Sequence, residues 1–228
     1  MIRNLHVMRR INRGVSVVIF GLLLAACTGN VVTEPSLPFL GNKDIEYKMK
    51  DGVEVADTLY HTVADFKYLN QDSVVITSES MKGKIWISDF FFSHCPTICP
   101  PMTTQMKRLN TSLNDLSDEI QFMSFSIDPK RDTPQRLREY IKEHEIEADN
   151  WSFFTGNEAA THKLGVESFL VHAGEDDTEP GGFAHGDIFT LVDREGHVRG
   201  IYHGTDAKDV DRMEEDVRIL LKYEYGVE

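Results

Sequence analysis

Cysteine is scarce in this chain, and basic residues are outnumbered by acidic ones. Only three cysteines occur among 228 residues, which excludes a scaffold held together by several disulfides. Asp and Glu number 37 against 24 Lys and Arg, so the formal charge is −13. A surface this acidic argues against binding of nucleic acid and against polybasic attraction to lipid. Hydrophobic residues make up 41% of the chain, enough for a full core without disulfides.

The chain also lacks a long hydrophobic run at its start. The apolar run over residues 15–26 has 12 residues and follows a basic region, so it is too short to cross a bilayer but has the length and flanks of a signal peptide. Small residues followed directly by Cys27 resemble a bacterial lipobox, in which the cysteine is acylated and becomes the new N-terminus. An ordinary signal peptide and a short uncleaved anchor are the alternatives.

The lipobox divides the chain into three parts. We expect residues 1–26 to be a lipoprotein signal peptide, residues 27–61 a lipid-anchored tether, and residues 62–228 a single domain. Proline and glycine with little periodicity in residues 28–44 support the tether. The protein is therefore expected outside the cytoplasm, on the periplasmic side of the cell membrane, with its lipid on Cys27.

The order of apolar segments predicts the fold. Residues 63–69 and 73–77 predict a β-hairpin, and the near-continuous apolar run 85–92 predicts a central strand covered on both faces. The other expected elements are a helix from near Cys99, a strand at 120–127, a helix after Thr133, a strand at 151–154, a helix at 158–164, a hairpin at 188–192 and 197–202, and a helix at 207–223. This order predicts an α/β, thioredoxin-like fold with an N-terminal β-hairpin extension and a mid-chain insertion at 174–182.

If Cys27 carries lipid, the remaining cysteines are Cys95 and Cys99. They lie between a buried strand and a helix, where ligand sites gather in open α/β sheets. The helix N-terminus favours thiolates, and a spacing of four residues places both sulfurs on one helical face. Dithiol–disulfide exchange and metal ligation both fit this pair, and two buried cysteines that are neighbours by chance are the third reading.

Among nine histidines, His185 is the candidate for a third ligand. It stands just before the strand expected at 188–192, in a loop that packs against the start of the cysteine helix in a thioredoxin-like layout. Two thiolates and one imidazole suit copper or zinc, and thiolates favour Cu(I). Structural zinc prefers four protein ligands, and no fourth is evident. The predicted metal ligands are Cys95, Cys99 and His185.

Three motifs resemble the Sco/SenC family: C-x-x-x-C-P at residues 95–100, D-P-x-x-D-T-P at residues 128–134, and His185 before a strand. The resemblance covers about residues 63–221. It implies a thioredoxin-like metallochaperone that helps to assemble the dinuclear copper centre of cytochrome c oxidase, with Cys95, Cys99 and His185 as ligands of Cu(I), Cu(II) or both. The implied partners are the copper-bearing oxidase subunit and, in addition, another periplasmic copper carrier or a thiol reductant.

Two features of these motifs leave a question open. Asp128 and Asp132 either face the metal site or a partner, or they cap a helix and close a loop. Gly186 and Asp187 follow the histidine where the family usually has Ser or Thr, which predicts a more flexible loop around His185.

The same residues allow other functions. A thiol–disulfide oxidoreductase that keeps oxidase-subunit cysteines reduced needs the redox pair Cys95 and Cys99 but not His185. A redox sensor that binds partners without transferring metal is the third hypothesis. Whether the chain has any enzymatic activity is therefore left open by its sequence.

Overall fold

The computed structural model of the chain describes residues 34–171, 173–175 and 183–227, and for residues 173–175 and 183–185 it describes the backbone alone. The expected signal peptide, Cys27 and most of the expected insertion lie outside these residues. Within them, no helix combines the length and the apolar character needed to cross a bilayer.

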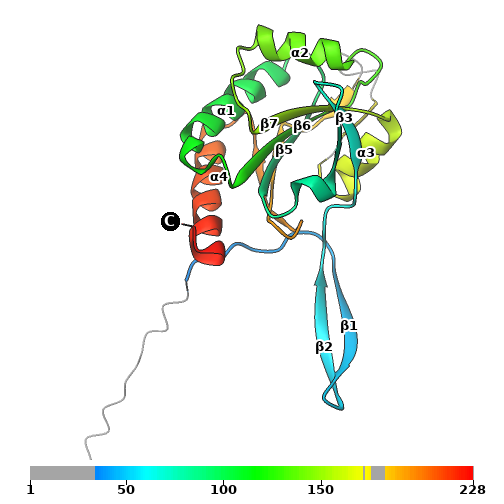
Figure 1. Cartoon of the computed structure of the whole chain (residues 1–228), viewed down its shortest axis with the longest axis vertical. Helices are drawn as coiled ribbons and strands as arrows, with labels where there is room; N and C mark the ends of the chain where they lie inside the picture. Colours follow the sequence, from blue (N-terminus) through cyan, green and yellow to red (C-terminus); the bar gives the residue numbers. More distant parts are fainter. Residues whose placement is uncertain (1–33, 172, 176–182, 228) are drawn as a thin grey trace, which may run out of the picture. The chain divides into compact units, whose positions relative to one another are not determined.

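A seven-stranded mixed sheet forms the centre of the domain (Figure 1). Strands β5, β6 and β7 run parallel, and their neighbours pair antiparallel. Every residue of β5 is buried, as expected for a strand covered on both faces. In spatial order the strands are β11 (Val198–His203), β10 (Ile188–Val192), β5 (Ile85–Phe91), β6 (Ile120–Ser126), β7 (Trp151–Thr155), β3 (Lys67–Asn70) and β4 (Val75–Thr77).

Local sequence explains where the helices begin. Helix α1 (Cys99–Ser112) has prolines in its first turn. Proline lacks an N–H group, and this costs nothing there because first-turn N–H groups have no acceptor within the helix. Thr133 caps α2 (Pro134–Glu143) by accepting the N–H of Arg136, and Asn157 caps the next helix in the same way. The remaining helical elements are α3 (Glu158–Glu167), α4 (Ala207–Ile219), the short 3-10 turns η1 (Ser78–Met81) and η2 (Asn114–Leu116), and the π-helical η3 (Leu220–Glu224).

The core has a layer on each face of the sheet. On one face, Phe125 packs against Phe90 and Phe154, with ring centroids 5.3 and 5.0 Å apart, and Gly165 of α3 lies against Phe90. On the other face, Phe91 packs against Tyr140 of α2, at 5.2 Å. Helices α1 and α4 lie side by side (Figure 1) and are joined by the Arg108–Asp211 ion pair, and Arg218 of α4 pairs with Asp115, just after α1.

Two further hairpins lie outside the main sheet. The strands β1 (Lys43–Lys50) and β2 (Val53–Tyr60) project away from the sheet and helices (Figure 1), within the range expected to be a tether. The hairpin expected at residues 63–77 is, by contrast, part of the main sheet, where it forms β3 and β4. A short hairpin of β8 (Ala173–Glu175) and β9 (Phe183–His185) flanks the expected insertion. The mixed α/β sheet with N-terminal hairpins confirms the predicted fold class.

Candidate metal and redox site

The cysteine pair lies where β5 ends and α1 begins. The N–H of Cys95 donates to the carbonyl of Phe92, 3.1 Å away, which turns the chain after the strand. One turn later the N–H of Cys99 reaches the Cys95 sulfur at 3.5 Å. Neither cysteine is part of a disulfide, and both are buried, with 8% and 1% of the residue exposed. The structure thus brings the two predicted sulfur ligands together at a helix N-terminus, as their spacing predicts.

The two sulfurs are electrostatically coupled. A hydrogen bond with Cys95 raises the pKa of the Cys99 thiol far above its usual range, and burial raises it further. The backbone at Phe92 opposes this shift, whereas the buried carboxylate of Asp89 adds to it. The reduced pair therefore retains a proton, which must leave when a metal binds or a disulfide forms.

A buried aspartate fixes the segment that leads to Cys95. Asp132 is fully buried and accepts the N–H of Ser93 at 3.1 Å, together with the hydroxyls of Ser93 and Ser126. Arg136 of α2 donates to the Ser93 hydroxyl oxygen at 3.1 Å. Asp128 is paired with Arg131. These contacts fit the reading in which the two aspartates close the loop.

Sequence reasoning missed several residues around the pair. Ser93 lies within the motif but carried no predicted role. Asp89 accepts the hydroxyl of Ser124 at 2.6 Å, and Ser124 in turn accepts the indole N–H of Trp151 at 2.9 Å. A carboxylate in an otherwise apolar strand was a visible signal for Asp89. Nothing in the sequence indicated that Tyr140 would hydrogen-bond Thr103 of α1, 2.6 Å away.

Backbone topology brings the segment around His185 to the same end of the sheet. Thr190 of β10 pairs antiparallel with Ser88 of β5, so the start of β10 lies beside the end of β5 that leads to Cys95. His185 ends β9, where its backbone pairs with Ala173. Its side chain lies outside what the structure describes, so its role as a ligand stays a prediction.

The residue pair after His185 is less free than the sequence predicts. Asp187 accepts the ring nitrogen of His203 at 2.9 Å and the hydroxyl of Thr205, and its carbonyl accepts the N–H of Gly204. Burial opposes ionisation of Asp187, but these hydrogen bonds outweigh it and lower its pKa. Asp187, the second residue after His185, is thus anchored by hydrogen bonds to the end of β11 and the segment that follows it.

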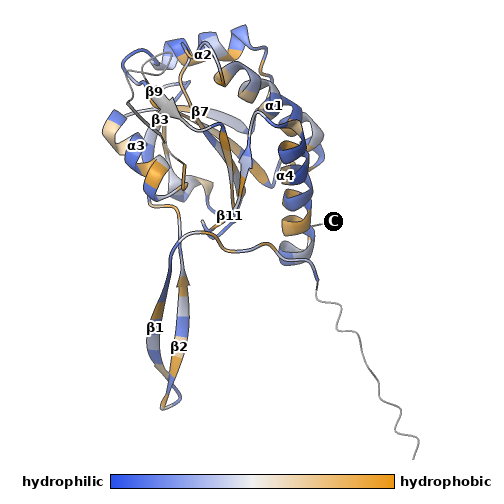
Figure 2. Ribbon diagram, turned by 180° about the vertical axis from the view of Figure 1, so that it is seen from behind, coloured by the Kyte–Doolittle hydropathy of each residue, from blue (hydrophilic) through white to orange (hydrophobic). Residues whose placement is uncertain are grey.

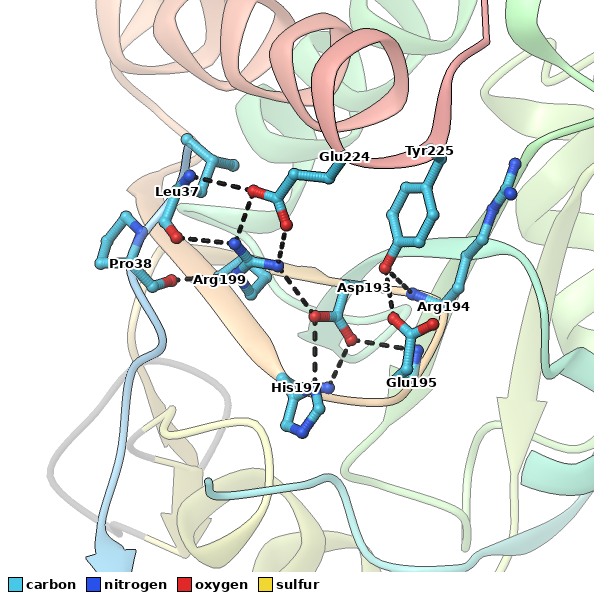
Figure 3. A network of polar contacts seen from close by, with 9 residues as sticks. All are labelled: Leu37, Pro38, Asp193, Arg194, Glu195, His197, Arg199, Glu224 and Tyr225. Atoms are coloured by element: carbon cyan, nitrogen blue, oxygen red, sulfur yellow. Dashed lines mark hydrogen bonds and ion pairs between the residues drawn. The ribbon is translucent and has the colours of Figure 1, made fainter. Parts of the chain in front are cut away.

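A second polar cluster lies at the opposite end of β10 (Figure 3). Asp193, Glu195 and His197 offer ligand atoms within 4.8 Å of one another, a set that sequence reasoning did not single out. Buried Arg199 already occupies this cluster, because its guanidinium donates to Asp193 at 3.0 Å and to Glu224 at 2.7 Å. A metal ion would have to displace that cation, so the cluster is structural.

Arg199 also holds the chain that enters the domain. It donates to the carbonyls of Leu37 and Pro38 (Figure 3). Its guanidinium also stacks on the ring of Phe39. Glu224 accepts the N–H of Leu37, 3.1 Å away. We call residues 37–40 the entry strap, since it is bound across β11 and η3.

Comparison with known proteins places this fold and these motifs in one family. Residues 55–222 match the SCO1/SenC family. The SCO1 protein homolog of Bacillus subtilis is 33% identical over 172 residues, which cover 73% of this chain and 86% of that protein. A SCO1/SenC family lipoprotein from Bacillus anthracis superposes with a TM-score of 0.64 at 31% identity, covering 69% of this chain and 94% of the other.

Two further solved structures share the fold. BsSco, a member of the Sco family of cytochrome c oxidase assembly proteins in which a disulfide switch was identified, has a TM-score of 0.60 and 31% identity, over 68% of this chain and 92% of that one. Yeast Sco1 with copper bound has a TM-score of 0.58 and 24% identity, over 72% and 93%. The chain belongs to the SCO1/SenC family.

Proposed function

We propose that this protein is a copper-binding metallochaperone that assists assembly of the dinuclear copper centre of cytochrome c oxidase. The observation that carries this proposal is the pair of buried cysteine sulfurs that lie together at the start of α1. Thiolates are soft ligands that suit Cu(I), and copper is the cargo rather than a permanent part of the protein. Family membership supports cytochrome c oxidase as the protein that receives the copper.

The proposed ligands are the sulfurs of Cys95 and Cys99 and the imidazole of His185. The register of β10 on β5 supports the third ligand, because it brings the chain just after His185 to the end of β5 that leads to Cys95. The hydrogen bond from the Ser93 N–H to Asp132 supports the cysteine ligands, because it fixes the segment before Cys95 and so reduces the rearrangement needed to bind a metal.

Copper titration of the reduced protein tests this proposal. The chain from residue 28 contains the whole compact unit that begins at Glu34, so it is titrated beside His185→Ala and His197→Ala. We expect one tightly held copper in the wild type, at least a tenfold loss of affinity in His185→Ala, and no loss in the control, because His197 lies at the far end of β10. Equal affinity in all three proteins would contradict the ligand assignment.

The second candidate function is thiol–disulfide exchange that keeps oxidase-subunit cysteines reduced. Contact of the Cys99 N–H with the Cys95 sulfur favours it, and a disulfide switch has been identified in BsSco. This activity requires both cysteines but not His185. Normal oxidase assembly in cells that carry His185→Ala, with assembly lost in Cys95→Ala, would select this function over copper delivery.

We further propose that lipid on Cys27 anchors the protein on the periplasmic side of the cell membrane. The apolar run that ends at a cysteine supports this location. A relative from Bacillus anthracis is a lipoprotein.

A further inference from the structure

The hairpin of β1 and β2 exposes several large apolar side chains to solvent. All eight residues of β1 are exposed, and Ile45, Tyr47 and Met49 expose 62%, 65% and 70% of their surface. Apolar and charged residues alternate along the hairpin (Figure 2). A sheet of two strands is marginally stable in water, whereas three or more strands support one another. Strand β1 also precedes residue 55, where the family match begins.

The outer edge of β1 has free backbone groups. The turn at Asp51 and Gly52 has φ angles of 52° and 79°, as in a two-residue type I′ turn, and Lys50 pairs with Val53. In such a hairpin the even-numbered residues of β1 bond to β2. The N–H of His61 donating to the carbonyl of Asn42, at 3.1 Å, continues that pattern. The odd-numbered residues therefore turn their N–H and C=O groups outward.

We propose that β1 pairs antiparallel with β1 of a second copy of this chain, about a two-fold axis at Tyr47. In that register Tyr47 faces Tyr47 and Ile45 faces Met49, so apolar side chains meet on one face. On the other face Glu46 meets Lys48 and Asp44 meets Lys50 of the second copy. Each pair occurs twice because the interface is isologous.

The charges select this register over its neighbours. Moving the axis to Glu46 or to Lys48 sets identical charges against each other across the axis. Moving the axis to Ile45 opposes Asp44 with Glu46, and moving it to Met49 opposes Lys48 with Lys50. Like charges directly opposite destabilise a strand pair. Among these five axes, only the one at Tyr47 places no two charges of the same sign opposite each other.

Pairing would turn two marginal hairpins into one four-stranded sheet, β2–β1–β1–β2. The outward backbone groups of β1 gain partners, and the exposed side chains of Ile45, Tyr47 and Met49 gain neighbours. A lipid surface fits the hairpin less well, because Asp51 and Glu54 lie at its tip among the apolar residues. The proposal concerns β1 alone and is independent of the copper site.

Sedimentation of the chain from residue 28, over a concentration series, tests the proposal. Asp44→Lys and Lys50→Asp each place two pairs of like charges in the interface, and each is expected to weaken the dimer about tenfold. The double variant exchanges the two charges, restores both pairs, and is expected to recover the wild-type dissociation constant. Asp118→Lys makes the same change in net charge as Asp44→Lys at an exposed site outside the hairpin, and is expected to have no effect.

Three outcomes would overturn the proposal. A monomer at every concentration would show that β1 does not pair with itself. A dimer that is insensitive to the single reversals, or that the double variant fails to restore, would place the interface elsewhere. A monomer that co-sediments with lipid vesicles through Ile45, Tyr47 and Met49 would assign the hairpin to the membrane instead. All variants alter exposed residues, so circular dichroism is expected to show an unchanged fold.

Discussion

The two ends of the sheet each use a buried aspartate to close a loop, but they surround it differently. At the cysteine end, Asp132 accepts hydrogen bonds from a backbone N–H and two serine hydroxyls. At the far end, Asp193 is bound by the guanidinium of Arg199, which Glu224 also holds. Neutral donors contact Asp132 directly, and the charged Arg136 reaches only the Ser93 hydroxyl, whereas a guanidinium contacts Asp193 itself and fastens the far end to the incoming chain.

Removing the cation at the far end is expected to have the largest effect. Arg199→Met leaves Asp193 buried without its charged partner, which costs about 3–5 kcal/mol in free energy of unfolding. Chemical denaturation of the apoprotein measures the loss. Arg199→Lys keeps the charge but loses the planar fork and is expected to lie between wild type and Arg199→Met. A loss below about 1 kcal/mol would mean that the network behaves like an exposed ion pair.

Changing the aspartate at the cysteine end is expected to have a smaller effect on stability and a larger effect on the site. Asp132→Asn keeps the shape but loses the charge-assisted bonds to Ser93 and Ser126, so the free energy of unfolding is expected to fall by about 2 kcal/mol. The copper affinity of folded protein is expected to fall as well, because Ser93 lies two residues before the proposed ligand Cys95. Arg199→Met is expected to leave that affinity unchanged once unfolded protein is excluded. An unchanged affinity in Asp132→Asn would show that the cysteine segment is fixed by other contacts.

The smallest expected effect concerns the reactivity of the Cys99 thiol as the pH is raised. The raised pKa of Cys99 means that its thiol keeps its proton as the pH rises through about 8.5, the usual cysteine value. Alkylation of Cys99, mapped by mass spectrometry, is therefore expected to stay slow across that range in the reduced protein. Cys95→Ala removes the largest cause of the shift, so Cys99 is expected to react faster in this variant at the same pH. Equal rates in the two proteins would assign the slow reaction to burial alone.

Much of the fold could be predicted because its signals are local. The apolar run of β5, the prolines after Cys99 and the cap at Thr133 each act within a few residues, and the structure has a strand or helix at each. The hairpin of β1 and β2 had a signal too, in the alternation of Ile45, Tyr47 and Met49 before Asp51-Gly52. The prolines and glycines before it indicate irregular chain instead, and for that reason the sequence predicts a tether over residues 27–61.

The surroundings of the site were less predictable because they depend on contacts between distant residues. Cys95 and Cys99 could be paired from their spacing alone. Asp132 reaches Ser93 across 39 residues, and Arg199 reaches Leu37 across 162. Neither periodicity nor composition reports which buried carboxylate meets which donor, since the tertiary fold decides it. The ligand role of His185 remains a prediction for the copper titration to test.

The entry strap has a mechanical consequence. Leu40 donates its N–H to the carbonyl of Val198 at 2.8 Å, and Arg199 grips the two carbonyls at Leu37 and Pro38. A pull on the chain before residue 37 is therefore transmitted first to β11 and η3. It reaches the cysteine segment only after the strap has peeled away. The strap thus protects the cysteine segment, at the other end of the sheet, from a force that acts on the chain before residue 37.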